Sequence, residues 1–175
     1  MGTHRNLSSR VIGVHGLPAP VISLIQEQAE ARGLYRDPLP HVTHGLRTDE
    51  VVSAGRRFGR ARPRRHATEL LLTPDVLVVS DRDPDRDGAD PDAQVTFHHL
   101  HQIEVTAAGE GQAGATLLST PVGSTERSTY AVPSDGGPET VRFLEALVDA
   151  AAQARGTADV PSSRTPVESL SPEYS

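Results

Sequence analysis

The feature that most constrains the fold is a succession of short apolar runs between residues 47 and 132, each ended by turn-forming residues. Runs of a few residues rich in Val, Leu, Ile and Thr are typical of β-strands. The best-defined pair is 69–73 and 76–80, because a Thr-Pro-Asp sequence with favourable turn chemistry joins the two runs. Further strands are expected near residues 11–14, from 51 into the Arg-rich segment, at 94–105 with a bend at His98 and His99, at 115–119 and at 127–132.

Two segments have the apolar spacing of amphipathic helices instead. The first follows Pro18 and Pro20 and is ended by Gly33, and its apolar face combines Val21, Leu24, Ile25 and Gln28. The second begins near Pro138, and its predicted apolar stripe contains Val141, Leu144, Leu147 and Val148. Each helix is therefore expected to bury that stripe.

This order of elements predicts an α+β fold: an open barrel of about seven antiparallel strands, capped by a C-terminal helix and preceded by an accessory helix. The domain itself is expected at 47–154. Residues 1–46 form an N-terminal extension, with a helix at about 18–33 followed by a linker. Residues 155–175 are rich in Ser, Pro and Thr, and this composition predicts a disordered tail.

Composition excludes several chemistries. The chain has no Cys, so disulfides, thiolate metal sites and a Cys nucleophile are excluded. All 17 basic residues are Arg, which excludes Schiff-base catalysis and phosphate binding by a P-loop Lys. The aromatic content of 3% argues against a stacking platform for single-stranded nucleic acid.

The net charge of −6 conceals a division of the chain. Residues 1–66 carry 11 Arg and 5 acidic residues, whereas residues 67–175 carry 6 Arg and 18 acidic residues. This asymmetry indicates either an anionic partner for the first part or packing of the two parts against each other.

Three stretches resemble a bacterial pleckstrin-homology-like (PH-like or GRAM-like) domain over residues 47–154. The hairpin 69–79 is similar to that family's apolar hairpin, 95–105 to its bent central strand, and the helix from Pro138 to its closing helix. The sequence departs from the family at Val76, where an Arg is usual, and in its weakly defined first strand. The resemblance implies a binding or adaptor module for phospholipid headgroups or peptides, usually without catalysis.

A cluster of arginines is the strongest candidate binding site. It comprises Arg56, Arg57, Arg60, Arg62, Arg64 and Arg65, with no acidic residue among them. Guanidinium groups bind phosphate oxygens in a bidentate manner, so an anionic lipid, another phosphate or a nucleic acid is a candidate ligand. The alternative is that the cluster forms a solvated loop or pairs with the acidic part of the chain.

The acidic segment 81–94 contains Asp83, Asp85, Asp87 and Gly88, which match the start of a calcium-binding loop. Its twelfth position is Gln94, where such a loop needs a bidentate Glu, and strands rather than helices are expected around it. The alternative is a solvated hairpin loop.

Histidines form two groups, His98, His99 and His101 on a strand, and His41 with His44 in the linker. Strand alternation places His99 and His101 on one face, at a spacing that fits a shared Zn²⁺, Ni²⁺ or Fe²⁺ ion. The alternative is a set of surface or pH-sensitive histidines. No nucleophile and carboxylate stand at a spacing that completes a catalytic site, so no catalytic residue is predicted.

Together these observations predict a non-catalytic binding or adaptor module for an anionic ligand, such as a phospholipid headgroup or other phosphate, or for a protein partner. The alternatives are a nucleic-acid-associated protein that uses Arg56 to Arg65, and a metal-binding protein or enzyme that uses His98, His99 and His101. No cofactor is expected, with Ca²⁺ or a transition metal as the alternative. The expected location is the cytoplasm, with peripheral membrane association and homo-oligomers through the N-terminal helix as options.

Overall fold

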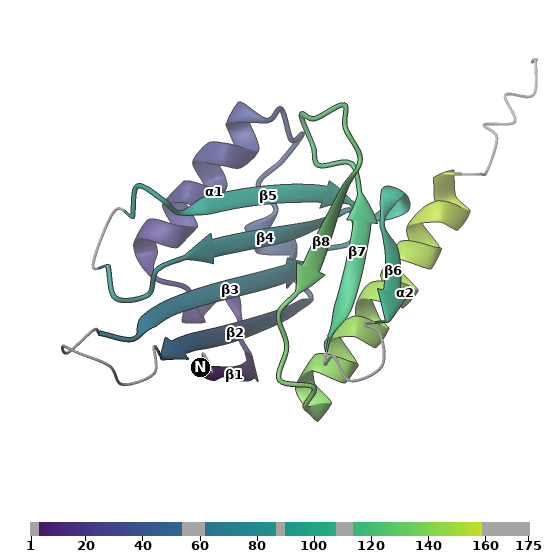
Figure 1. The fold of residues 1–175 in the computed structure, drawn as a ribbon. Helices are drawn as coiled ribbons and strands as arrows, with labels where there is room; N and C mark the ends of the chain where they lie inside the picture. Colours follow the sequence, from purple (N-terminus) through teal and green to yellow (C-terminus); the bar gives the residue numbers. More distant parts are fainter. Residues whose placement is uncertain (1–3, 54–61, 87–89, 108–113, 159–175) are drawn as a thin grey trace, which may run out of the picture.

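The computed structural model describes residues 4–53, 62–86, 90–107 and 114–158, which form an α+β fold with two antiparallel sheets (Figure 1). The strands are β1 (His4–Val11), β2 (His44–Ser53), β3 (Arg64–Leu72), β4 (Val76–Arg82), β5 (Gln94–His99), β6 (Glu104–Ala107), β7 (Ala115–Ser119) and β8 (Ser128–Val132). The helices are α1 (Ala19–Ala31) and α2 (Pro138–Ala158), with single 3-10 turns η1 (Val14–Gly16), η2 (Leu39–His41) and η3 (Leu100–Gln102). Among the residues described, no helix combines the length and hydropathy that a bilayer crossing requires.

The larger sheet has the order β1-β2-β3-β4-β5, with every neighbouring pair antiparallel. Its centre is the predicted hairpin of β3 and β4, which the structure confirms, with Leu70 opposite Val79. Both strands are buried along most of their length, which agrees with the apolar runs 70–72 and 76–79 beside the turn. The strand expected from residue 51 into the Arg-rich segment corresponds to β2, but β2 begins earlier, at His44, and residues 54–61 of that segment lie outside the described part of the chain.

The predicted strand 94–105 is interrupted. Strand β5 ends at His99, the 3-10 turn η3 follows, and β6 then joins a separate sheet with the order β6-β7-β8. Leu100, the first residue of this turn, and Ile103, directly after it, are fully buried, so core packing holds the break in place. Within the described residues the two sheets are not closed into a barrel, and an isolated bridge between His98 and Pro121 joins β5 to the segment after β7.

The N-terminal strand lies earlier than expected. The expectation of a strand at 11–14 was wrong, because β1 ends at Val11 and Val14 belongs to η1. Strand β1 is mostly polar, and it is held at the sheet edge by antiparallel pairing with β2. Two of its backbone amides bind carboxylates near the start of α2: Ser9 N lies 2.9 Å from Asp135 Oδ2, and Val11 N lies 3.1 Å from Glu139 Oε2.

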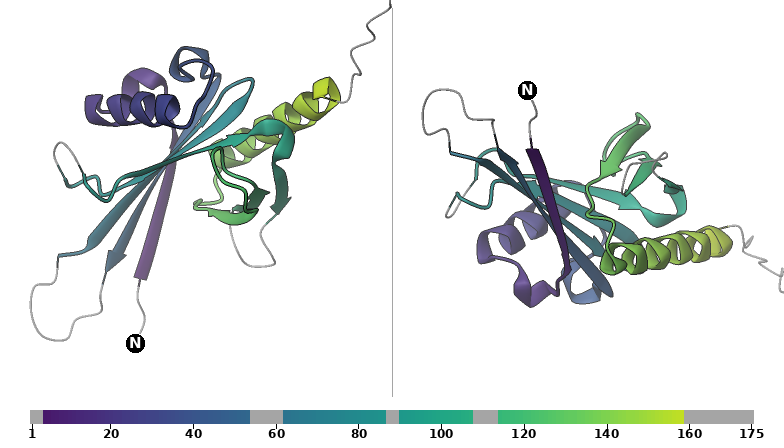
Figure 2. Two further views of the ribbon diagram at one scale, coloured as in Figure 1. Left: turned by 90° about the horizontal axis from the view of Figure 1, so that it is seen from above. Right: turned by 60° about the horizontal axis from the view of Figure 1, so that its bottom comes forward.

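The five-stranded sheet is covered on both faces, as Figure 2 shows from two directions. Helix α1 covers one face, where Val21, Ile25 and Ala29 belong to the same buried cluster as Val78 and Phe97. The small sheet and α2 cover the other face, and the buried cluster there includes Leu46, Leu70, Val79, Leu117, Phe143 and Leu147. The helix expected at about 18–33 is therefore part of the fold's packing.

Helix α2 is present as expected, but it is rotated relative to the predicted stripe. It contacts η3, β1 and β2, and the residues that it buries are Thr140, Phe143, Leu147 and Ala151. Leu147 belongs to the predicted stripe, whereas Val141 and Val148 remain 49% and 45% exposed. The contacts at the end of the large sheet, rather than the sequence stripe alone, decide which side of α2 is buried.

Candidate functional site

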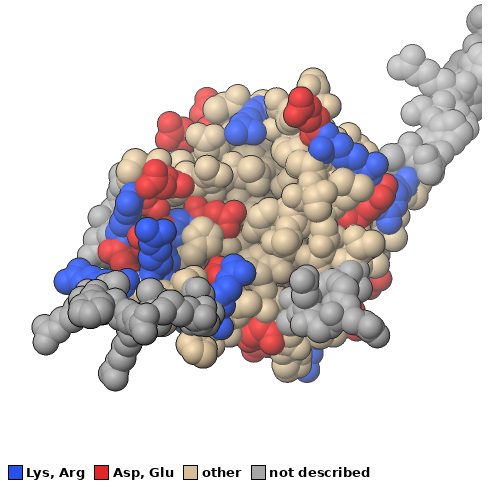
Figure 3. All heavy atoms as spheres, viewed as in Figure 1, with Lys and Arg blue, Asp and Glu red and all other residues tan. Residues whose placement is uncertain are grey.

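Three arginines of the predicted cluster lie in the described part of the chain. Arg62, Arg64 and Arg65 are exposed at the beginning of β3, while Arg56, Arg57 and Arg60 lie outside the described residues. Arg65 Nη1 lies 2.9 Å from Asp85 Oδ1, so this arginine contacts the acidic segment. Figure 3 shows basic and acidic side chains interleaved over this side of the molecule. The anionic-ligand hypothesis for the cluster stays a prediction.

The acidic segment is organised around Arg86. The Arg86 guanidinium lies 2.9 Å from Asp90, 2.8 Å from Asp92 and 3.8 Å from Asp83. The pKa of Asp90 is lowered, chiefly by the hydrogen bond that it accepts from the backbone N–H of Asp83. Of the predicted calcium ligands, Asp83 and Asp85 are described and Asp87 is not. Across the described ranges, no group of three His, Asp or Glu side chains is arranged to hold a metal ion.

His98 and His99 have opposite environments although they are adjacent in sequence. His98 is 3% exposed, and its Nδ1 forms a hydrogen bond with Ser119 Oγ of the small sheet. Its Nε2 has no partner among the described residues, and burial lowers its pKa to about 4. His99 is only partly buried, and its ring centroid lies 5.5 Å from that of His101. The three predicted histidines therefore do not converge on one point.

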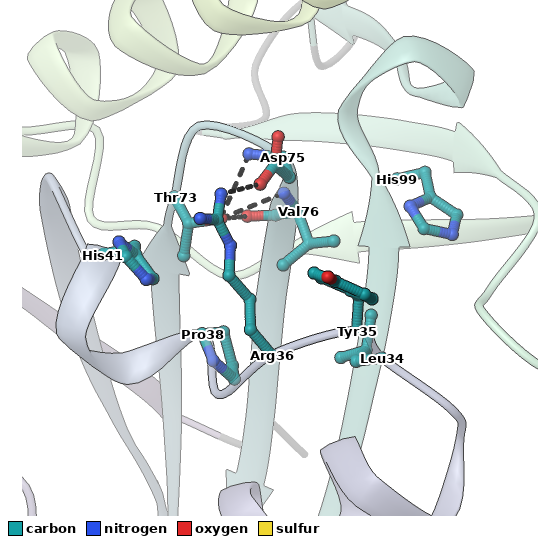
Figure 4. A pocket seen from close by; sticks show the side chains of 9 residues that line it. All are labelled: Leu34, Tyr35, Arg36, Pro38, His41, Thr73, Asp75, Val76 and His99. Carbon is teal, nitrogen blue, oxygen red and sulfur yellow. Dashed lines mark hydrogen bonds and ion pairs between the residues drawn. The ribbon is translucent and has the colours of Figure 1, made fainter.

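His99 instead shares a cavity with His41 from the segment that was expected to be a linker (Figure 4). The cavity has a volume of about 420 Å³, and its lining is mostly apolar, with Leu34, Tyr35, Arg36, Pro38, His41, Thr73, Asp75, Val76 and His99. Burial is the main cause that lowers the pKa of His99, and the neighbouring His101 adds to the effect. Cavities of this size and composition are common sites for small ligands or for one side chain of a partner.

One wall of this cavity, referred to below as the Tyr35 cavity, is held by the turn between β3 and β4. The Thr73 hydroxyl donates to the carbonyl of Val76 at 2.9 Å and accepts from the Val76 N–H at 3.0 Å. Leu100 N donates to the carbonyl of Asp75 at 3.0 Å, which ties the turn to η3. These contacts position Asp75 at the mouth of the cavity.

The facing wall follows the end of α1. Gly33 adopts a positive φ of 72°, a conformation that ends helices, and the chain then passes through Leu34 to Tyr35 and Arg36. Tyr35 is fully exposed, and Arg36 Nη2 lies 2.7 Å from Asp75 Oδ2 across the cavity. In Figure 4, His41 and His99 lie on either side of this ion pair. The arrangement offers an aromatic ring, a guanidinium and two imidazoles around an apolar hollow.

A second, polar hollow of about 470 Å³ lies between the large sheet and β8. Asp81 Oδ1 is its centre, with Thr68 Oγ1 at 2.7 Å, His66 Nε2 at 3.2 Å and the Tyr130 hydroxyl at 3.5 Å. Burial and the nearby Asp81 carboxylate raise the pKa of Tyr130 well above its usual value. Two hydroxyl groups and one imidazole nitrogen thus already contact one oxygen of this carboxylate.

Sequence reasoning missed Tyr35, Arg36 and Asp75. The signal that was available is the dipeptide Tyr35-Arg36 between Gly33 and Pro38, in a chain with only three Tyr and three Phe. An aromatic residue beside an arginine in such a segment is a typical composition of binding surfaces.

No protein-family model, curated protein or solved structure matches this chain.

Proposed function

We propose that this protein is a non-catalytic binding module of the adaptor type, and that a protein partner binds it at the Tyr35 cavity. The observation that carries the proposal is the fully exposed Tyr35 ring beside a mostly apolar cavity. An aromatic side chain buries about 150–250 Å² when it becomes covered, so exposure of this ring leaves a large favourable contribution unused. A partner that inserts one apolar side chain into the cavity would cover the ring at the same time.

The residues at the cavity mouth suit such an interface. Tyr and Arg are enriched among the residues that dominate binding energies, and here Tyr35 and Arg36 are adjacent. The Arg36–Asp75 ion pair is about half exposed on both sides, and exposed pairs stabilise a protein by only about 0–1 kcal/mol. Arg36 can therefore turn towards a partner at small cost.

The architecture supports a PH-like arrangement as the scaffold of this module. Strands β2 to β5 form four consecutive antiparallel strands, β6 to β8 form three more, and α2 follows. This succession of strands followed by a helix is the support for the PH-like proposal, while the two sheets are not closed into a barrel within the described residues. In this proposal β1 and α1 are additions, and α1 supplies the segment that carries Tyr35.

Site-specific photocrosslinking tests the proposal. A benzophenone amino acid is introduced at position 35 and, as a matched control, at the exposed position 153 on α2, and both proteins are expressed in the native host. We expect a protein that crosslinks at position 35 and not at position 153. Binding of that purified protein should weaken about tenfold or more in Tyr35→Ser, because each 1.4 kcal/mol of lost binding energy is a factor of ten. Identical products at both positions, or unchanged affinity of Tyr35→Ser, would refute the assignment of the cavity.

The anionic-ligand hypothesis gives a different result in the same set of variants. If an anionic surface were the ligand, binding to phosphatidylglycerol vesicles would fall in Arg62→Ala/Arg64→Ala/Arg65→Ala and would be unaffected by Tyr35→Ser. If a protein is the partner, the pattern is reversed: the Tyr35 variant loses the crosslinked protein and the triple variant retains it.

A further inference from the structure

The side of α2 that does not face the core has a second apolar surface. Val141 and Val148 are seven residues apart, so they lie on one side of the helix, and both are about half exposed. With Leu144 they line a groove of about 570 Å³, whose other wall is Val105 of β6 with Gly114 and Ala115 at the start of β7. This α2 groove shares no lining residue with the Tyr35 cavity.

The exposure of these two valines is a consequence of how α2 is anchored. Phe143, Leu147 and Ala151 are buried against the core, so a rotation that covered Val141 and Val148 would expose them. The helix also cannot turn freely at its beginning, because the Glu139 carboxylate binds the backbone N–H of Val11. The anchoring of α2 thus keeps the apolar side chains of the groove exposed.

Strand β6 adds backbone groups to this surface. It is an edge strand of the small sheet, and within the described ranges its only strand partner is β7. An edge strand presents unpaired N–H and C=O groups that an extended segment of another chain can bind. The groove therefore combines side-chain pockets with a strand edge.

The negative charge of the groove favours some binding partners over others. Its remaining lining residues are Glu145 and Asp149, both exposed and both acidic. A second copy of α2 would bring the same two carboxylates towards them, and like charges in contact are unfavourable. Residues 159–175 contain one Arg against three acidic residues, so this part of the chain does not supply complementary charge either.

We propose that the α2 groove binds a short, extended, cationic segment of another protein, with apolar side chains between Val105 and the two valines and Lys or Arg beside Glu145 and Asp149. This second surface goes beyond the partner proposed for the Tyr35 cavity, and two separate surfaces are what an adaptor needs.

Fluorescence anisotropy with synthetic peptides tests this proposal on the full-length protein. The probes are fluorescein-labelled decapeptides in which Val and Leu alternate with Arg, and matched peptides in which Glu replaces every Arg. We expect the wild type to bind the cationic set and not the anionic set, with an affinity that falls as salt is raised. Val141→Asp/Val148→Asp should weaken binding of the cationic set about tenfold or more.

Two further variants distinguish the groove from general charge effects. Ala152→Asp/Gln153→Asp adds the same charge at exposed positions of α2 that do not line the groove, and it should leave binding unchanged. Glu145→Lys/Asp149→Lys should reverse the preference and bind the anionic set. The circular dichroism spectrum of each variant checks that it is folded.

The proposal is overturned if the wild type binds neither set, or if the charge reversal leaves the preference unchanged. It is also overturned if sedimentation shows a wild-type dimer that Val141→Asp/Val148→Asp dissociates, because the occupant is then a second copy. The two proposals can be separated with Tyr35→Ser. If this variant loses the crosslinked partner but still binds the cationic peptides, the peptide binds at the α2 groove independently of the Tyr35 cavity.

Discussion

The two long helices cover opposite faces of the same sheet, and they use their apolar side chains differently. Helix α1 buries Val21, Ile25 and Ala29 against the sheet, and its other large apolar side chains, Ile22 and Leu24, pack partly buried beside them. Helix α2 buries Phe143 and Leu147 but leaves Val141 and Val148 half exposed. The difference shows that an apolar residue on an amphipathic helix is not thereby a core residue. Stability should therefore depend on the buried positions of both helices and hardly at all on the two exposed valines.

The largest expected effect tests that division directly. Ile25→Ala in α1 and Leu147→Ala in α2 each remove a fully buried side chain, and each should reduce the free energy of unfolding by about 2–5 kcal/mol. Val148→Ala should change it by less than about 0.5 kcal/mol, since Val148 is about half exposed at the surface of α2. Urea denaturation followed by far-ultraviolet circular dichroism measures all three. If Val148→Ala lowered the free energy of unfolding as much as Leu147→Ala, the distinction between buried and exposed apolar residues of α2 would be wrong.

The next effect concerns the contact between the sheets on the α2 side. His98 is held neutral, with its pKa lowered from 6.5 to about 4 by burial, so the unfolded chain binds a proton more readily than the folded protein. This contribution to stability is fully present above pH 6.5 and is lost as the pH falls towards 4. About 2 kcal/mol should be lost by pH 5, and about 3 kcal/mol in total.

Urea denaturation at pH 7.5 and pH 5 tests this pH dependence in the wild type and in His98→Gln. Between these two pH values, the free energy of unfolding should fall by about 2 kcal/mol less in His98→Gln than in the wild type. His99→Gln is the matched control, because His99 is less buried and should retain most of that decrease. An imidazole resonance of His98 that titrates near 6.5 would contradict the assignment.

The smallest expected effect concerns the ion pair between Asp75, in the turn between β3 and β4, and Arg36, in the connection that follows α1. Asp75→Asn removes the exposed ion pair with Arg36, and it should cost about 0.2–1 kcal/mol. Thermal unfolding at low and high salt provides the measurement, and the difference between the two proteins should shrink at high salt. A loss of several kcal/mol would mean that the cavity mouth is part of the core on the α1 side.

The predictability of the fold from sequence follows the same division between buried and exposed positions. The hairpin of β3 and β4 was predictable because the parts of the strands beside the turn, 70–72 and 76–79, are apolar throughout and the turn between them is strong. Strand β1 was not, because an edge strand that is mostly exposed needs no apolar pattern. The side of α2 that is buried was not predictable, because Ala and other apolar residues occupy several faces of the segment 141–154. More than one apolar stripe therefore fits this segment.

The candidate site was harder to predict than the fold. Its residues come from three separate parts of the chain, the segment after α1, the turn at Asp75 and the end of β5 at His99. Segments outside helices and strands have no periodicity, so nothing in the sequence indicates that His41 and His99 line one cavity. The predicted proximity of His99 and His101 is confirmed, but the 3-10 turn η3 brings the two rings together rather than strand alternation, because the chain leaves the strand at Leu100.

The two carboxylates that bind the amides of β1 have a consequence for the order of assembly during synthesis. Ser9 and Val11 leave the ribosome more than a hundred residues before Asp135 and Glu139. The edge of β1 stays uncapped while the residues in between are synthesised, and contacts this distant in sequence form late. The nascent chain thus presents an open strand edge until the first turn of α2 emerges, and that interval is when a chaperone has most to protect.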